Sequence, residues 1–155
     1  MSMIGELRQV PATLVPALED RVKRREAATM VMALDGLSLD KAWSALGFLL
    51  GGLCAEDSLT GHALHGVDSR YGPPEPLTPP EVAACALERA RTDHGSLRDA
   101  YDPPTMVRGN VYPNIWNRVE ERERNLIWLL EVFRRVRDFY QDAARSGRGM
   151  LYFVS

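Results

Sequence analysis

The sequence predicts a helix-dominated α+β fold in which a small, mostly antiparallel sheet includes both terminal strands. Three observations support this fold class. The apolar stretch Met3–Val10 ends at a proline, as a short strand often does. Met150–Val154 is a second apolar strand candidate at the other end of the sequence. Between them, apolar residues recur at the three- or four-residue spacing of helices, so we expect several helices to pack against the sheet.

The composition is that of an ordinary globular protein. Of its 155 residues, 45% are hydrophobic and 26% are charged, and the formal net charge is -2. We expect a single domain over residues 1–155, because a chain of this size can bury a core without disulfides or metals. The small net charge gives no general attraction to nucleic acid or to an anionic membrane. The sequence shows neither a leader peptide nor an apolar run of about 20 residues, so we expect a cytoplasmic location.

The first half of the sequence contains three predicted helices. The first covers Pro11–Glu19 and the second covers Asp20–Leu34. Ser38 is expected to cap the third helix, with Asp40 in its first turn, where a carboxylate interacts favourably with the helix dipole. This helix should end near Gly51. Its apolar face is predicted to contain Ala42, Trp43, Ala45, Leu46, Leu49, Leu50 and Leu53.

Prolines dominate the segment that begins the second half. Gly72–Pro80 is expected to be a rigid extended segment, and Leu77 or Val67–Tyr71 is a candidate additional strand. The pattern of Thr78–Glu81 is a capping box with proline in the first turn, so it predicts the start of a helix. This helix should end near Asp93. Its buried face is predicted to contain Val82, Cys85, Ala86 and Ala90.

Two short helices and one long helix are predicted after this point. A serine followed by an acidic residue three positions later signals a helix over Ser96–Tyr101, and Asp102 before a proline signals another. Asn117 begins a similar signal for the long helix, which should end near Ser146 with Gly147 as a left-handed C-cap. The predicted apolar face of the long helix contains Leu126, Leu129, Leu130, Phe133, Val136, Tyr140, Ala143 and Ala144.

Short strings spread over the whole sequence carry a family resemblance. They are MSMIGELRQV, LSLDKAWSALGFLLGG, YGPPEPLTPPEV, YDPPTMVRGNVYPNIW and FYQDAARSGRGMLYFVS. Together they resemble the bacterial YfbM-like family, over nearly the whole chain and most specifically in the two central strings and the last strand. The resemblance implies a compact cytosolic α+β domain in a family whose biochemical role is unknown.

The cysteines and histidines form no recognisable metal pattern. Cys54 and Cys85 lie in apolar segments, so buried free thiols are expected, with a disulfide as the less favoured alternative. His62 and His65 have a spacing that suits a helical metal pair, but their segment lacks a helical period and a specified third ligand. His94 is expected at the surface. We therefore predict neither a metal site nor a cofactor.

Several activities have no support in the sequence. The glycine-rich nucleotide-binding patterns, the Gly-x-Ser-x-Gly pattern and the His-Glu-x-x-His pattern are all missing, which weakens the case for an enzyme without excluding one. The basic runs at 21–25 and 134–137 are balanced by neighbouring acidic residues. They predict solvated faces with local ion pairs and not a nucleic-acid site.

One candidate binding cleft begins near the third predicted helix. Asp40, Lys41 and Trp43 bring together a carboxylate, an amine and an indole, and Tyr71 is the fourth proposed member of this site. The structural alternative is that Asp40 caps a helix, Lys41 is solvated and Trp43 belongs to the core.

A second candidate surface is the aromatic loop Tyr112–Trp116. Tyr112 and Trp116 are candidate anchors for a ligand or a protein partner. The alternative is that Trp116 fills the end of the long helix as a core residue.

The favoured hypothesis is a non-enzymatic interaction protein, accessory or immunity-like, that binds another protein through this aromatic loop. The alternative is a sensory or catalytic small-molecule pocket around Asp40, Lys41, Trp43 and Tyr71. No residue can be assigned a catalytic role. A homodimer through an edge strand or the long helix is compatible with the sequence but is not specified by it.

Overall fold

The sheet contains both of the terminal strands that were predicted. The computed structural model describes residues 2–19, 30–51 and 76–154. Within them the sheet has the order β2-β1-β3, with β1 at Gly5–Val10, β2 at Gly36–Asp40 and β3 at Gly149–Val154. Both pairs are antiparallel, and Leu7 of β1 lies opposite Leu37 of β2 and Tyr152 of β3. The predicted α+β fold is confirmed.

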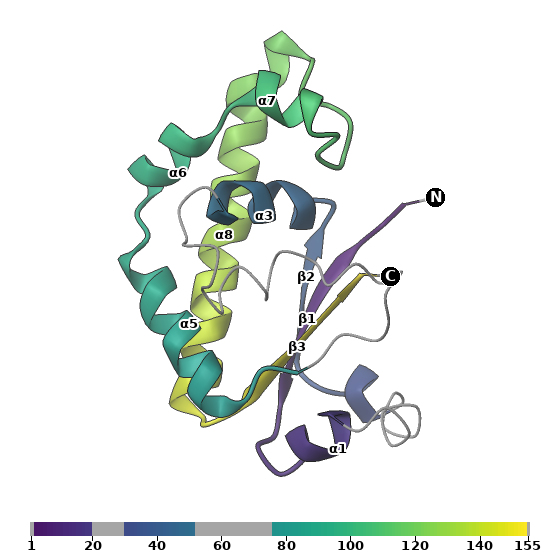
Figure 1. Cartoon of the computed structure of the whole chain (residues 1–155), viewed down its shortest axis with the longest axis vertical. Coiled ribbons are helices and arrows are strands. Elements are labelled where there is room, and N and C mark those ends of the chain that lie inside the picture. Colours follow the sequence, from purple (N-terminus) through teal and green to yellow (C-terminus); the bar gives the residue numbers. More distant parts are fainter. Residues whose placement is uncertain (1, 20–29, 52–75, 155) are drawn as a thin grey trace.

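Several of the helices pack against one long helix. Figure 1 shows α8 running along the molecule, with the sheet on one side and α5 and α6 on the other. The helical segments are α1 (Val15–Glu19), α3 (Trp43–Gly51), α5 (Pro79–Arg91), α6 (His94–Ala100), α7 (Pro103–Arg108), the 3-10 turn η2 (Val119–Glu121) and α8 (Arg122–Arg145).

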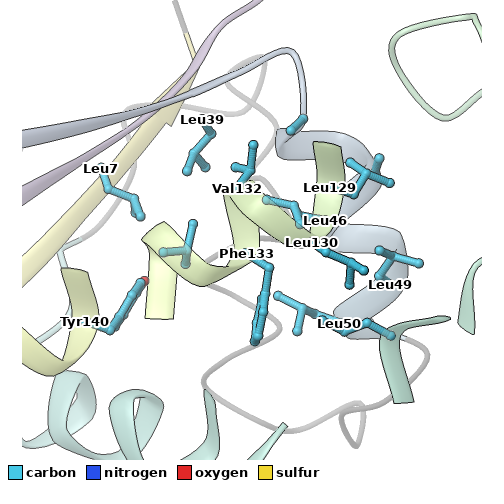
Figure 2. Packing of buried hydrophobic residues seen from close by; sticks show 14 of the residues in the cluster. Leu7, Leu39, Leu46, Leu49, Leu50, Leu129, Leu130, Val132, Phe133 and Tyr140 are labelled. Carbon is cyan, nitrogen blue, oxygen red and sulfur yellow. The ribbon is translucent and has the colours of Figure 1, made fainter. Parts of the chain in front are cut away.

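The main core lies where α3 and α8 meet the sheet. Figure 2 shows Leu7 and Leu39 projecting from the sheet toward side chains of α8, which also meet leucines of α3. The predicted apolar face of α8 is buried, apart from half-buried Ala144. Burying such a continuous stripe removes apolar surface from water and fixes α8 on the sheet. The α3 residues in this contact are Leu46, Leu49 and Leu50.

A second, smaller apolar cluster forms beside α1. Val10 of β1 and Leu151 of β3 pack there with Val15 and Leu18 of α1 and with Val31. Side chains in a strand alternate between the two faces of the sheet. Val10 and Leu151 therefore lie on the face opposite to that of Leu7 and Tyr152, and they pack in this second cluster.

The prediction that Ser38 begins a helix is wrong. Residues 36–40 form β2, and the helix begins only at Trp43. In β2 the side chain of Leu39 is fully buried while Ser38 and Asp40 are exposed, which is the two-residue period of a strand. Asp40 then turns the chain with a left-handed φ of 49°.

Three of the four helix starts predicted in the second half are those of α5, α6 and α8. Thr78 caps α5 as predicted, accepting a hydrogen bond from the Glu81 amide at 3.4 Å. The helix α6 begins earlier than predicted because Asp93, and not Ser96, is its cap. The long helix begins at Arg122 after the η2 turn, so the predicted start at Asn117 is also wrong.

The buried face of α5 differs from the prediction at one position. Ala90 is exposed, and the neighbouring Arg89 is buried instead. The guanidinium carbon of Arg89 lies 4.7 Å from the centre of the Tyr140 ring. A cation–π contact of this kind partly compensates a buried positive charge, so an arginine can occupy a core position here.

Other sequence predictions agree with the structure where it describes the residues. Leu77 forms an isolated antiparallel bridge with Met150, and Gly147 follows α8 with a φ of 63°. Cys85 is buried, as expected. Among the described residues, no helix has both the length and the apolar character needed to cross a bilayer. The predictions for 20–29, Val67–Tyr71, Leu53, Cys54, His62 and His65 lie outside the described residues.

The cap of α7 leads to a prediction about pH. Asp102 accepts hydrogen bonds from the Thr105 hydroxyl at 2.6 Å and from the Thr105 amide at 3.3 Å. These bonds hold the pKa of Asp102 below its ordinary value of 3.8. A carboxyl with a lowered folded pKa stabilises the fold above its unfolded pKa, and this contribution is lost as the pH falls through the folded value.

We therefore expect Asp102 to titrate below 3.8, and the Thr105 amide resonance to move with it in an NMR titration. The variant Asp102→Asn is the control, because asparagine is also a good cap but has no carboxyl to titrate. A carboxyl that titrates at or above its ordinary value would contradict this assignment.

Candidate functional site

Two of the predicted site residues, far apart in the sequence, meet at the surface. Trp43 is the first residue of α3, and Tyr112 lies in the loop that follows α7; both are half-buried. Their rings stack with centroids 5.8 Å apart and an interplanar angle of 28°. The Tyr112 amide also donates to the Ser44 hydroxyl at 3.2 Å, which ties the loop to α3. We call Trp43 and Tyr112 the aromatic pair.

The polar atoms of the aromatic pair both bind the main chain of Met3. The indole Nε1 of Trp43 donates to the Met3 carbonyl at 3.2 Å. The Met3 amide donates to the phenol oxygen of Tyr112 at 3.2 Å. Met3 precedes β1, and its own side chain is 41% exposed. The aromatic pair therefore holds one residue by both of its backbone groups.

A glycine explains how the strand and the helix come so close at this point. A Cβ added at Gly5 would lie 2.5 Å from the Trp43 Cβ and 2.9 Å from its Cγ. Only glycine leaves room for that approach. Gly5 is also the first residue of β1 and pairs with both Asp40 and Val154. The position of the indole is thus fixed by the sheet as well as by α3.

The other predicted cleft lies only partly within the described residues. Asp40 and Lys41 are both exposed, and the Asp40 amide donates to the Ser38 hydroxyl at 3.1 Å. Asp40 ends a strand, so it does not cap a helix as the structural alternative required. Tyr71 lies outside the described residues. A pocket formed by Asp40, Lys41, Trp43 and Tyr71 stays a prediction.

Trp116 is a core residue and not a surface anchor. Its side chain is 1% exposed, and its Nε1 donates to the Val111 carbonyl at 2.8 Å. The Tyr101 ring meets it edge-on, with centroids 6.3 Å apart. Trp116 therefore lies where the alternative interpretation of the aromatic loop placed it, and it presents no surface to a partner.

A cluster of buried polar side chains lies between α5, α8 and β3. Besides Arg89 it contains Tyr140 and Tyr152, whose hydroxyls have no hydrogen-bond partner among the residues that the structure describes. Burial raises the pKa of both phenols far above its ordinary value. They therefore stay neutral at physiological pH and are unsuited to act as bases.

The comparisons with known proteins identify the family. A family model described as a domain of unknown function (DUF1877) matches residues 1–153. The chain belongs to the DUF1877 family. The solved structure of a protein of unknown function, YfbM from Escherichia coli, is similar to it with a TM-score of 0.77 and 19% sequence identity.

That structural match covers 97% of this chain and 98% of the YfbM chain. At this identity the likeness shows the fold alone, and it agrees with the YfbM-like resemblance seen in the sequence. A comparison with curated proteins gave no match. DUF1877 membership assigns no activity, so any function must be argued from the site.

Proposed function

We propose that this protein is a non-enzymatic binding protein that recognises a partner protein through the aromatic pair. The observation that carries the proposal is the stacking of Trp43 on Tyr112 at the surface, 5.8 Å between centroids. Aromatic side chains provide a large contact area with few rotatable bonds, so little conformational entropy is lost on binding.

The surroundings of the aromatic pair support a role in recognition. Ser44 fixes the loop that carries Tyr112, and Gly5 lets β1 pack against Trp43. The rings are therefore held by rigid elements before any partner arrives, and preorganisation of this kind improves affinity. The accessory or immunity-like role is part of this proposal.

Truncating either ring should remove most of the binding energy. We expect Trp43→Ala and Tyr112→Ala each to weaken capture of the partner by roughly 10- to 100-fold, as residues at the centre of an interface do. The measurement is quantitative affinity capture from lysate of the source organism with the full chain, with circular dichroism to verify folding.

Leu87→Ala is the matched control, because Leu87 is an exposed apolar residue on α5, outside the aromatic pair. It should capture the same proteins as the original chain. If folded Trp43→Ala and Tyr112→Ala proteins retain every partner, the proposal is wrong.

A small-molecule site around Asp40, Lys41, Trp43 and Tyr71 is the second candidate function. One observation favours it: Asp40 has a left-handed φ of 49°, and such backbone outliers in non-glycine residues cluster at functional sites. The effects of two mutations distinguish this candidate from the protein-binding proposal. Ligand affinity would then fall with Asp40→Asn and not with Tyr112→Ala.

A further inference from the structure

We propose that the aromatic pair recognises the main chain of an extended peptide segment, and that residues 2–4 of the same chain occupy this site as an intramolecular competitor. This inference rests on the proposed function and specifies both the chemistry of the partner and the regulation of the site. The protein would bind its partner fully only after Met3 has left the aromatic pair.

The first argument is what the two rings bind. Trp43 contributes a donor and Tyr112 an acceptor, and both are used on the carbonyl and the amide of Met3, each at 3.2 Å. A donor and an acceptor so placed match the two backbone groups that every residue except proline carries. Neither bond involves the methionine side chain. Recognition of this type accepts many sequences, as in other complexes that bind extended peptides through the main chain.

The second argument is how Met3 is held. Met3 lies two residues before the strand, whose pairing with both neighbours begins at Gly5. The two hydrogen bonds to Met3 are exposed to solvent, where water can replace either partner, so each shifts the equilibrium between bound and released Met3 by roughly tenfold at most. Met3 can therefore leave while β1 stays paired and packed against Trp43.

The third argument concerns competition. A segment joined to the site by a short piece of chain acts at an effective concentration in the millimolar range, so it competes strongly even when its own contacts are weak. The apparent affinity for a separate peptide is then the intrinsic affinity multiplied by the fraction of molecules in which the site is open. Weakening the Met3 contact should increase affinity for a peptide supplied in solution.

The experiment uses the full chain and a peptide copied from the present occupant. The probe is a fluorescein-labelled, amidated peptide with the sequence Ser-Met-Ile-Gly of residues 2–5. The protein variant is Met3→Pro, which removes the amide hydrogen that Tyr112 accepts. We expect Met3→Pro to bind the peptide roughly 10-fold more tightly than the original chain, measured by fluorescence anisotropy.

Three controls make the result specific. Met3→Ala keeps the amide hydrogen and should behave like the original chain. A peptide with an N-methylated methionine lacks that hydrogen and should bind Met3→Pro roughly 10-fold more weakly than the unmodified peptide. Adding Tyr112→Phe to Met3→Pro should abolish the gain, while the indole resonance of Trp43 should shift with peptide only when the pair is intact.

The outcomes separate this inference from the proposed function. Equal binding of the peptide to Met3→Pro and the original chain would overturn the competition, and no binding to either would overturn main-chain recognition. If capture from lysate still depends on Trp43 and Tyr112 in that case, the proposed function stands and only this inference falls. If capture is also independent of both rings, both proposals fall.

Discussion

Replacing Trp116 with alanine is expected to lower the free energy of unfolding by about 3–5 kcal/mol. The indole is almost completely buried in the core and meets the Tyr101 ring edge-on. Its removal leaves a cavity that the neighbouring helices cannot fill, and it leaves the Val111 carbonyl without the donor that it now has at 2.8 Å. Urea denaturation followed by circular dichroism measures this change.

Trp43→Ala is the variant whose loss of stability is compared with that of Trp116→Ala. Trp43 is half-buried and its hydrogen bond is exposed, so its truncation should cost clearly less stability than that of Trp116. Trp116→Phe should fall between them, because it keeps an apolar ring and loses only the Val111 bond and part of the volume. If Trp43→Ala proved as destabilising as Trp116→Ala, Trp43 would be a core residue and the aromatic pair would not be a binding surface.

The parts of the fold that could be predicted are those whose signal is local or strongly periodic. The apolar face of α8 repeats over many turns, so its burial follows from the sequence. The cap at Thr78, the cap at Asp102 and the C-cap at Gly147 each involve residue types that suit those positions for steric or hydrogen-bonding reasons. Such signals act within a few residues of the chain.

The strand β2 could not be predicted because its cause is not local. It has only five residues, so its alternation is brief, and its apolar positions Leu37 and Leu39 precede a helical pattern directly. Ser38 before an acidic residue resembles a helix start on its own. What makes the segment a strand is pairing with β1, where Leu37 lies opposite Leu7. That partner is about thirty residues away in the sequence.

The sequence indicated both residues of the aromatic pair but neither their arrangement nor the contact with Met3. Trp43 and Tyr112 were both identified as candidates, yet nothing local indicates that their rings stack. Met3 was missed because it contributes backbone atoms, which every residue has. Trp116 resembles Tyr112 in the sequence, and the folded chain shows that Trp116 is the one in the core, buried and bonded to the Val111 carbonyl.

A buried glutamine carries the second large prediction. Gln9 of β1 is 2% exposed, and its amide nitrogen donates to the Phe139 carbonyl at 3.3 Å and to the Asp142 carboxylate at 3.0 Å. Its carbonyl accepts from Arg148 at 2.8 Å. We expect Gln9→Leu to lower the free energy of unfolding by about 2–4 kcal/mol, because hydrogen bonds to charged groups contribute more than neutral ones. Urea denaturation at pH 7 measures it.

Gln9→Glu tests whether the effect comes from these bonds or from packing. The introduced carboxylate can still accept from Arg148, but it faces Asp142, and this repulsion should raise its folded pKa. A raised carboxyl pKa destabilises the fold at neutral pH, and the loss is relieved as the pH falls and the group is protonated. The destabilisation of Gln9→Glu should therefore shrink toward acid, whereas that of Gln9→Leu should change little. The result that would contradict this prediction is that both variants are as stable as the original chain. The hydrogen bonds of Gln9 to Asp142 and Arg148 would then make no net contribution to stability, and apolar contacts alone would hold the end of α8 on the sheet.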